Sequence, residues 1–352
     1  MENYRIDSHK LMFHPRRIAE WLEKGDTYPI SVEVSPSGRC NHKCIFCALD
    51  FTGYNNPYLL PKILGERLEE MQRLGVKAII FAGEGEPLLH PNIRNILVHT
   101  KEIGLDESVS TNGVFLGRIL EECLKHLTWI RISLDALEQG TYSYIHGCKG
   151  EDLSSVMAGL EVMCKLRKGN RYDCTIGTQL LLLRENLNEV IPLARLLRST
   201  GVDYLSIKPY SQHPLSHNRL NPNFSELELM ELQKKLEEEE TPGFQIVFRN
   251  EALKRVGKEK SYSKCLGLPF FCYIDSKGDV YTCSTYIGNL NFSYGNIYSN
   301  TFEEIWKSDK RKEVLSHVDK LDISACRENC RLDPINNYLW ELKHPVNHIN
   351  FI

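Results

Sequence analysis

Short apolar runs alternate with amphipathic stretches along residues 28–210. The apolar runs predict strands at Ile30–Ser35, Val76–Phe81, Ser108–Thr111, Trp129–Leu134, Cys174–Leu182 and Tyr204–Lys208. Apolar residues at helical spacing predict helices at Lys62–Leu74, Asn92–Ile103, Gly117–His126, Asp152–Arg167 and Leu187–Ser199. This alternation indicates βαβ units and a parallel sheet, folded as a partial (β/α) barrel or an open doubly wound sheet. In either fold the working face is the C-terminal edge of the strands.

The pattern changes after residue 210. Residues 212–223 are rich in Pro, His, Ser and Asn and predict a loop, and Ser225–Glu240 predicts a helix that opens on an N-cap serine. A region bearing several cysteines begins near residue 261. We therefore expect an N-terminal extension (1–27), a core domain (28–224), a connecting helical segment (225–260), a small cysteine-rich domain (261–335) and a C-terminal tail (336–352).

The composition is ordinary for a folded protein, with 42% hydrophobic and 25% charged residues. A formal net charge of -3 argues against nucleic acid or an anionic membrane surface as the main partner, because both require a basic patch. No apolar run approaches the roughly 18 residues that a membrane span needs, and the N-terminus lacks the apolar segment of a secretory signal. These features predict a cytoplasmic protein.

Twelve cysteines suggest metal or redox chemistry, because clustered cysteines in a chain without a secretory signal seldom form disulfides. Cys40, Cys44 and Cys47 lie together soon after the first predicted strand. Three thiolates on one tight loop can each bind one iron of a 4Fe–4S cube, which leaves the fourth iron open to a substrate. A zinc knuckle or a ferredoxin-like cluster is the alternative, and the presence of three cysteines rather than four counts against it.

The CxxxCxxC spacing, with Phe46 before the last cysteine, resembles the signature of the radical S-adenosylmethionine (SAM) superfamily. The resemblance implies that SAM chelates the open iron and is cleaved to a 5′-deoxyadenosyl radical. It also implies a partial (β/α)6 barrel, followed here by a small α+β cysteine-rich domain.

Three further stretches fit the family pattern in order. Gly85-Glu86-Pro87 aligns with the motif that holds the SAM amino group, although Glu84 replaces the usual first glycine. The remaining expected SAM contacts are Phe46 in the cysteine loop and, at the ends of the third and fourth strands, Ser110, Asn112, Ser133 and Asp135. The family's Arg-Gly pair is His146-Gly147 here, so the SAM carboxylate contact is either absent or supplied by a residue such as Arg131 or Gln179.

The C-terminal cysteines resemble the SPASM/twitch extension of radical SAM enzymes, which binds auxiliary iron–sulfur clusters. Cys265 and Cys283 flank a predicted hairpin whose turn is Asp275–Asp279. With Cys326 and Cys330 they imply one auxiliary 4Fe–4S cluster, and structural zinc is the alternative. Cys272 is then spare, and burial is its simplest explanation.

The resemblance leaves the substrate open. We expect a dehydrogenase or epimerase of a small polar substrate (a sugar, cyclitol or nucleotide sugar), supplied with electrons by flavodoxin or ferredoxin. A peptide- or protein-modifying enzyme is the first alternative, and the few residues before the first strand are too short for a peptide-binding winged helix. A non-catalytic iron–sulfur electron carrier or sensor is the second.

Candidate residues for substrate chemistry follow from their positions at predicted strands. Expected substrate contacts are Gln179, Lys208 and Tyr210. Candidate hydrogen-donor thiols are Cys148, Cys174 and Cys272.

Overall fold

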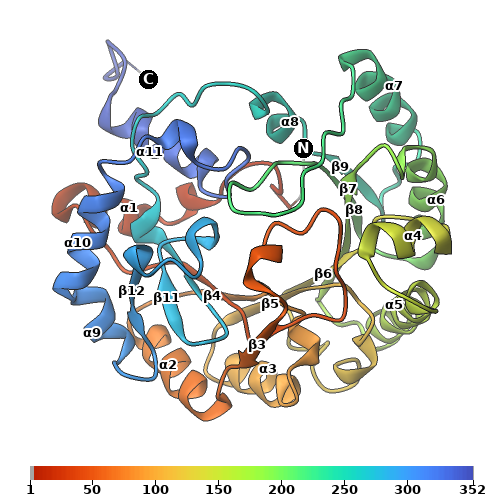
Figure 1. Cartoon of the computed structure of the whole chain (residues 1–352), viewed down its shortest axis with the longest axis horizontal. Coiled ribbons are helices and arrows are strands. Elements are labelled where there is room, and N and C mark those ends of the chain that lie inside the picture. The colour runs from red at the N-terminus through yellow and green to blue at the C-terminus, as the bar shows by residue number, and fades with distance from the viewer. Residues whose placement is uncertain (1–3, 352) are drawn as a thin grey trace.

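The computed structural model describes residues 4–351, and a ten-stranded sheet forms its centre (Figure 1). Seven strands of this sheet run parallel in sequence order, as the pattern predicts for βαβ units. They are β1 (Ser31–Val34), β4 (Ala78–Phe81), β5 (Asp106–Thr111), β6 (Trp129–Ser133), β7 (Thr175–Leu182), β8 (Tyr204–Pro209) and β9 (Gln245–Phe248). The first six confirm the predicted strands, and the parallel sheet with its outer helices confirms the partial barrel (Figure 1).

Helices cover the outer face of the sheet at or near the predicted places (Figure 1). They are α2 (Pro61–Arg73), α3 (Ile93–Glu102), α5 (Asp152–Asn170), α6 (Val190–Thr200) and α7 (Glu226–Glu237). The capping box of α7 is formed by Ser225 and Glu228, which confirms the predicted N-cap. The helices α1 (Pro15–Lys24) and α4 (Gln139–His146) are among those that the sequence did not predict.

The helix predicted at Gly117–His126 is wrong. The segment forms a 3₁₀ turn at Leu116–Arg118 followed by irregular turns. Its apolar side chains are still buried, which is why their spacing resembles a helix. Glycine at position 117 disfavours a helix, and the Arg118 carbonyl accepts a hydrogen bond from the Arg94 side chain (3.1 Å) instead of from a helical N–H.

The cysteine-rich region continues the central sheet. Strand β10 (Phe271–Ile274) pairs in parallel with β1, and the antiparallel strands β11 (Asp279–Tyr281) and β12 (Ser293–Asn296) follow it. The predicted hairpin turn is present between β10 and β11, where Asp275 Oδ1 accepts hydrogen bonds from the N–H groups of Lys277 and Asp279. The other elements are the ribbon β2 (Ser37–Arg39) and β3 (Asn55–Tyr58), and the helices α8 (Asn250–Arg255), α9 (Phe302–Lys307), α10 (Asp309–Val318) and α11 (Asp333–Lys343).

The parallel strands bury aliphatic residues against the helices and turn polar residues inward. Val32, Ile79, Ile130 and Leu205 are fully buried on the helical side, together with Leu64 and Leu97 of the covering helices. Neighbouring positions in these strands face the barrel interior, because successive strand residues alternate between faces. Inward positions include Glu33, Ser110, Arg131, Gln179 and Lys208. Among helices of the described residues, none is long and apolar enough to cross a bilayer.

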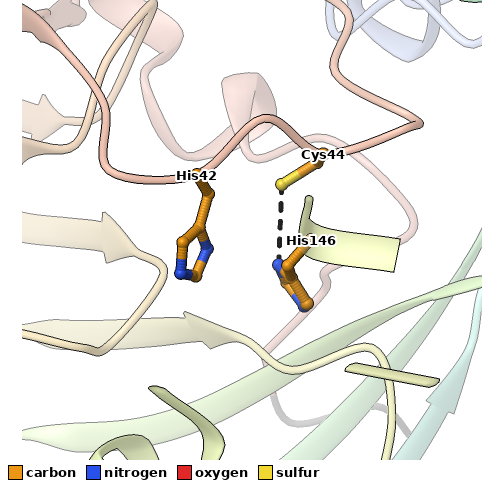
Figure 2. A group of neighbouring side chains, drawn as sticks. All are labelled: His42, Cys44 and His146. Atoms are coloured by element: carbon orange, nitrogen blue, oxygen red, sulfur yellow. Dashed lines mark hydrogen bonds between the residues drawn. The ribbon is translucent and has the colours of Figure 1, made fainter. Parts of the chain in front are cut away.

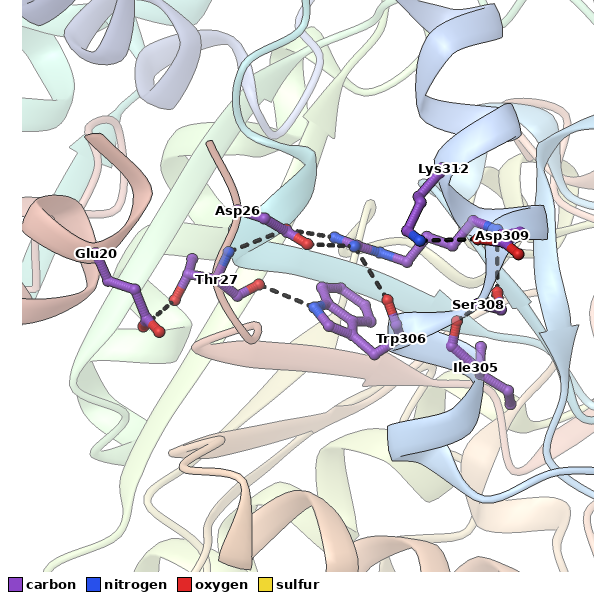
Figure 3. Close-up of polar contacts among 9 residues, drawn as sticks. Glu20, Asp26, Thr27, Ile305, Trp306, Ser308, Asp309 and Lys312 are labelled. Atoms are coloured by element: carbon purple, nitrogen blue, oxygen red, sulfur yellow. Dashed lines mark hydrogen bonds and ion pairs between the residues drawn. The ribbon is translucent and has the colours of Figure 1, made fainter. Parts of the chain in front are cut away.

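A polar network joins the N-terminal segment to the cysteine-rich region (Figure 3). Asp26 forms a two-pronged ion pair with the buried guanidinium of Arg311 (2.6 and 2.7 Å), which also lies 3.9 Å from the Trp306 ring centroid. Trp306 Nε1 donates to the Thr27 carbonyl (2.9 Å), and the Thr27 hydroxyl donates to Glu20 (2.7 Å). The network therefore holds together segments almost 300 positions apart in the sequence.

We expect Asp26→Asn to destabilise the reconstituted protein by about 2 kcal/mol, because it removes the half-exposed carboxylate that pairs with the buried Arg311 charge. Urea unfolding followed by circular dichroism measures the change. The control is Asp309→Asn, which breaks a solvent-exposed ion pair on α10, the helix that carries Arg311. It should shift the urea midpoint little. Equal midpoints for both variants would contradict this role of Asp26.

Candidate functional site

The loop carrying the first three cysteines follows β2 and is fixed by the end of α4. The N–H groups of Lys43 and Ile45 donate to the carbonyls of His146 and Ile145 (3.0 and 2.9 Å). Gly147, which ends α4 at φ +55°, lies so close that a Cβ there would meet the Lys43 carbonyl at 2.1 Å. The His146-Gly147 pair therefore positions the cysteine loop through backbone contacts.

The environment of Cys40, Cys44 and Cys47 fits a metal cluster. All three are half-buried free thiols, and burial raises their pKa, to about 12 for Cys40. The pKa of Cys44 is raised further by the negative charges of Cys47 and Cys40, so the three thiols lie near one another. Burying several thiolates together is costly unless a metal balances them, and three sulfur ligands suit the irons of a 4Fe–4S cube.

His146 bridges Cys44 and a buried carboxylate. Its Nδ1 lies 3.5 Å from Cys44 Sγ (Figure 2), and its Nε2 lies 3.3 Å from Asp135 Oδ2. His42 lies beside it, with Nε2 3.0 Å from Asp152, and the ligand atoms of His42, Cys44 and His146 all lie within 4.8 Å of one another (Figure 2). As an imidazolium, with Nε2–H facing the carboxylate, His146 would also carry a proton on Nδ1, the nitrogen that faces the sulfur.

We expect His146→Gln to lower the reduction potential of the N-terminal cluster by on the order of 50 mV, because hydrogen bonds to cluster sulfurs raise this potential. For a one-electron couple, about 59 mV corresponds to a tenfold change in the equilibrium constant. A redox titration followed by electron paramagnetic resonance gives this value. His99→Gln, at a partly exposed histidine on α3, serves as the control. An unchanged potential in His146→Gln would remove His146 from this role.

Glu86 is a buried carboxylate held at the ends of two strands. Its oxygens accept hydrogen bonds from the Thr111 hydroxyl (2.6 Å) and from the N–H groups of Asn112 (2.8 Å) and Leu88 (2.9 Å). Burial raises the pKa of Glu86, and these hydrogen bonds only partly offset the effect. A cation beside it, such as the ammonium of SAM, would favour the ionised carboxylate. The position therefore fits the role that the motif predicts.

The residues before Glu86 pack against the protein itself. A Cβ on Gly85 would meet the Ser37 and Arg39 carbonyls at 2.3 and 2.5 Å, and the Glu86 N–H donates to the same Arg39 carbonyl (2.8 Å). Glu84, which departs from the family pattern, accepts hydrogen bonds from the Ser276 N–H (3.0 Å) and hydroxyl. The motif thus links the base of the cysteine loop to the C-terminal hairpin, while Pro87 opens a 3₁₀ turn.

The other expected SAM contacts surround the same edge of the sheet. Asn112 donates to the Asn41 side chain in the cysteine loop (2.8 Å), and Phe46 packs edge-on against His146 with ring centroids 5.9 Å apart. Ser110 and Ser133 are half-buried. Asp135 is almost fully buried, and its Oδ1 accepts from the Leu181 N–H (2.5 Å). That carboxylate is already engaged by protein groups, and its contact with a ribose stays a prediction.

The four C-terminal cysteines come together at one place. Burial raises the pKa of Cys265, and the charges of Cys330, Cys283 and Cys326 raise it further. Three side chains contact the sulfurs: Asn336 donates to Cys265 (3.6 Å), Thr282 donates to Cys283 (3.8 Å), and the Tyr286 hydroxyl lies 3.5 Å from Cys326. Four converging thiols with polar neighbours fit a four-thiolate cluster.

The three candidate hydrogen-donor thiols lie in different places. Cys148 is half-buried and follows Gly147, and its charge acts on Cys44. Cys174 is buried just before β7, where burial raises its pKa to about 12. Cys272 is fully buried in β10, as expected for a spare cysteine. The structure brings Cys148 alone of the three close to the cluster loop.

A cavity of about 310 Å³ connects the barrel interior to the C-terminal cysteines. Gln179 and Lys208 line it, as predicted, and Cys283 and Cys330 form part of its wall. Tyr210 is not among its lining residues and donates to Gln212 (2.7 Å). Sequence reasoning missed Arg327 and Arg331, although each directly follows one of the C-terminal cysteines, a signal that could have indicated them.

Comparison with known proteins identifies two family matches. Residues 34–197 match the model of the radical SAM superfamily, and residues 265–331 match an iron–sulfur cluster-binding domain, SPASM. The chain is 25% identical over 289 residues to the AdoMet-dependent heme synthase of Methanosarcina barkeri, covering 76% of this chain and 79% of that protein. It is 27% identical over 204 residues to the GTP 3′,8-cyclase of Clostridium acetobutylicum, covering 56% and 62%.

Solved structures of similar fold include Streptococcus suis SuiB bound to S-adenosylmethionine, with a TM-score of 0.67 and 17% identity over 95% of this chain and 79% of that one. Native anSMEcpe with bound AdoMet has a TM-score of 0.56 and 17% identity, covering 88% of each chain. At these identities the likeness concerns the fold alone.

Proposed function

Since this chain belongs to the radical SAM superfamily and carries a C-terminal SPASM domain, we propose that it is an oxidoreductase that dehydrogenates a small polar substrate in the barrel cavity. We propose Cys40, Cys44 and Cys47 as the ligands of the SAM-binding 4Fe–4S cluster. Cys265, Cys283, Cys326 and Cys330 are the proposed ligands of one auxiliary cluster. A flavodoxin or ferredoxin is the proposed reductant, and the cytoplasm the proposed location.

The proposal is carried by the cavity, which has inward barrel side chains on one wall and Cys283 and Cys330 on another. When bound, SAM and its cluster would supply hydrogen-atom abstraction from the substrate, and the auxiliary cluster would supply one-electron oxidation, so that together they would remove two electrons and two protons. Gln179 and Lys208 are placed to hold polar groups of the substrate. The volume of the cavity lies at the small end of the range for ligand pockets, which favours a small molecule as substrate.

Dehydrogenation is favoured over epimerisation by the cavity's thiols. Among the described residues that line it, the thiols are Cys283 and Cys330, and both are proposed cluster ligands. Epimerisation would need a further thiol to return a hydrogen atom to the substrate. The names of two relatives, a heme synthase and a GTP cyclase, refer to small molecules and support a small substrate over a peptide.

The experiment is deuterium transfer under anaerobic turnover. Reconstituted enzyme is given SAM, dithionite and deuterated sugars, cyclitols or nucleotide sugars, and 5′-deoxyadenosine is analysed by mass spectrometry. We expect deuterium in 5′-deoxyadenosine and a product two hydrogens lighter than its substrate. Transfer from peptides alone would favour a peptide-modifying enzyme, and no 5′-deoxyadenosine under any condition would favour an electron carrier.

A further inference from the structure

The cavity wall has an excess of positive charge. Six cationic side chains line it: Arg131, Lys208, Arg249, Arg255, Arg327 and Arg331. Three of them are neutralised by carboxylates, in the pairs Arg249 with Asp7 (3.3 Å), Arg255 with Asp333 (3.3 Å), and Arg331 with Glu33. Three cations therefore remain without a negative partner among residues 4–351.

The unpaired cations have few other contacts. Arg131 lies over the Trp129 ring, 5.3 Å from its centroid, and its buried Nε has no hydrogen-bond partner. Within the described part of the chain, the Lys208 side chain forms neither an ion pair nor a hydrogen bond, and only its backbone pairs, with β7. Arg327 donates only to the Ser211 carbonyl (3.3 Å). Arg131 and Lys208 are on β6 and β8, so the rigid sheet presents both to the cavity.

This arrangement is unfavourable without a ligand. Burial lowers the pKa of Lys208 well below its usual value, and the positive charges of Arg327, Arg249 and Arg131 lower it further. Charged groups taken out of water are costly unless an opposite charge or hydrogen bonds compensate them. A negative ligand would supply both at once.

Bound clusters could neutralise only part of this charge. Arg327 lies in the field of the Cys330 and Cys47 thiolates, so the proposed clusters balance it. No cysteine is among the charged groups that act most strongly on Arg131 or Lys208. Glu33 does act on Arg131, but its carboxylate is already paired with Arg331. SAM would bring one carboxylate, for which Arg131 is a candidate contact, so the excess at Lys208 in particular calls for a separate anion.

We propose that the substrate is anionic and that its phosphate or carboxylate groups bind at Arg131 and Lys208. Arg131 offers a planar fork of donors that matches either group, and Lys208 offers a point charge. Identifying this anion as the substrate rests on the proposed function, but the binding of an anion by the cavity does not.

The test measures anion binding without turnover. Reconstituted enzyme is titrated calorimetrically with inorganic phosphate and, separately, with glutarate, at constant ionic strength. We expect at least one to bind, with phosphate alone or glutarate alone identifying the group. Lys208→Met and Arg131→Met should each weaken binding at least about 10-fold, since each removes a charged hydrogen bond to the anion. Lys234→Met, at an exposed lysine on α7, should bind as the wild type does.

A second measurement separates lost binding from misfolding. Without ligand, Lys208→Met should unfold at a temperature equal to or above that of the wild type, because it removes an uncompensated buried charge. Binding of neither anion, or equal binding by Lys208→Met and the wild type, would overturn the inference. If the anions fail to bind while a neutral sugar still transfers deuterium, the proposed function survives alone. If they bind and no substrate transfers deuterium, the inference survives alone.

Discussion

Replacing Cys40, Cys44 and Cys47 together by alanine should reduce 5′-deoxyadenosine formation from SAM to the level of a protein-free control. The three thiols converge on one loop that α4 fixes by backbone hydrogen bonds, and their removal leaves no site for the cluster that binds SAM. Reconstituted enzyme is incubated with SAM and dithionite, and the nucleoside is quantified by liquid chromatography.

The matched control replaces Cys265, Cys283, Cys326 and Cys330 by alanine. This variant should still form 5′-deoxyadenosine but should no longer oxidise the substrate, because the proposed electron acceptor beside the cavity is gone. SAM cleavage at the wild-type rate by the Cys40, Cys44 and Cys47 variant would contradict the assignment of these thiols.

Gly85→Ala should have a comparably large effect through sterics alone. Its Cβ would meet three backbone atoms, of Ser37 and Arg39, at 2.3–2.8 Å, and backbone cannot move aside as the end of a side chain can. Overpacking of this kind costs roughly 1–3 kcal/mol. Because β2 leads directly into Cys40, we expect the strain to displace the cysteine loop and to remove about half of the bound iron.

Gly140→Ala is the control for Gly85→Ala. A Cβ at Gly140 meets nothing within 4 Å, and alanine in α4 should stabilise the helix by up to about 1 kcal/mol. Its iron content and SAM cleavage should equal those of the wild type. Wild-type iron content and SAM cleavage in Gly85→Ala would show that cluster binding does not depend on the close packing of Gly85 against β2.

The fold was predictable where local pattern and tertiary environment agree. Most of the six core strands carry aliphatic residues on the face buried under helices, and burial on one face gives the pattern that periodicity detects. The segment after Leu116 has the same apolar spacing with only isolated helical hydrogen bonds, because spacing reports which side chains are buried and not how the backbone is bonded. The parallel pairing of β10 with β1 joins segments 240 residues apart, which no local pattern indicates.

The same distinction applies to the site. The cysteine spacing indicates the cluster loop because the three proposed ligands, Cys40, Cys44 and Cys47, lie within eight residues of the sequence. In the sequence, Glu84 is only a departure from the motif. Its hydrogen-bond partner Ser276 is identified by the folded structure alone. The charge excess at Arg131 and Lys208 likewise depends on which carboxylates reach the cavity, and pairing across the fold decides that.

Iron and sulfide per chain, measured after anaerobic reconstitution of the wild type and of the Cys40, Cys44 and Cys47 alanine variant, test most directly whether two clusters are present. About eight irons falling to about four is the expected result, for one SAM-binding and one auxiliary 4Fe–4S cluster. About four irons falling to none, with or without zinc in the wild type, would contradict the auxiliary cluster and the dehydrogenation that depends on it.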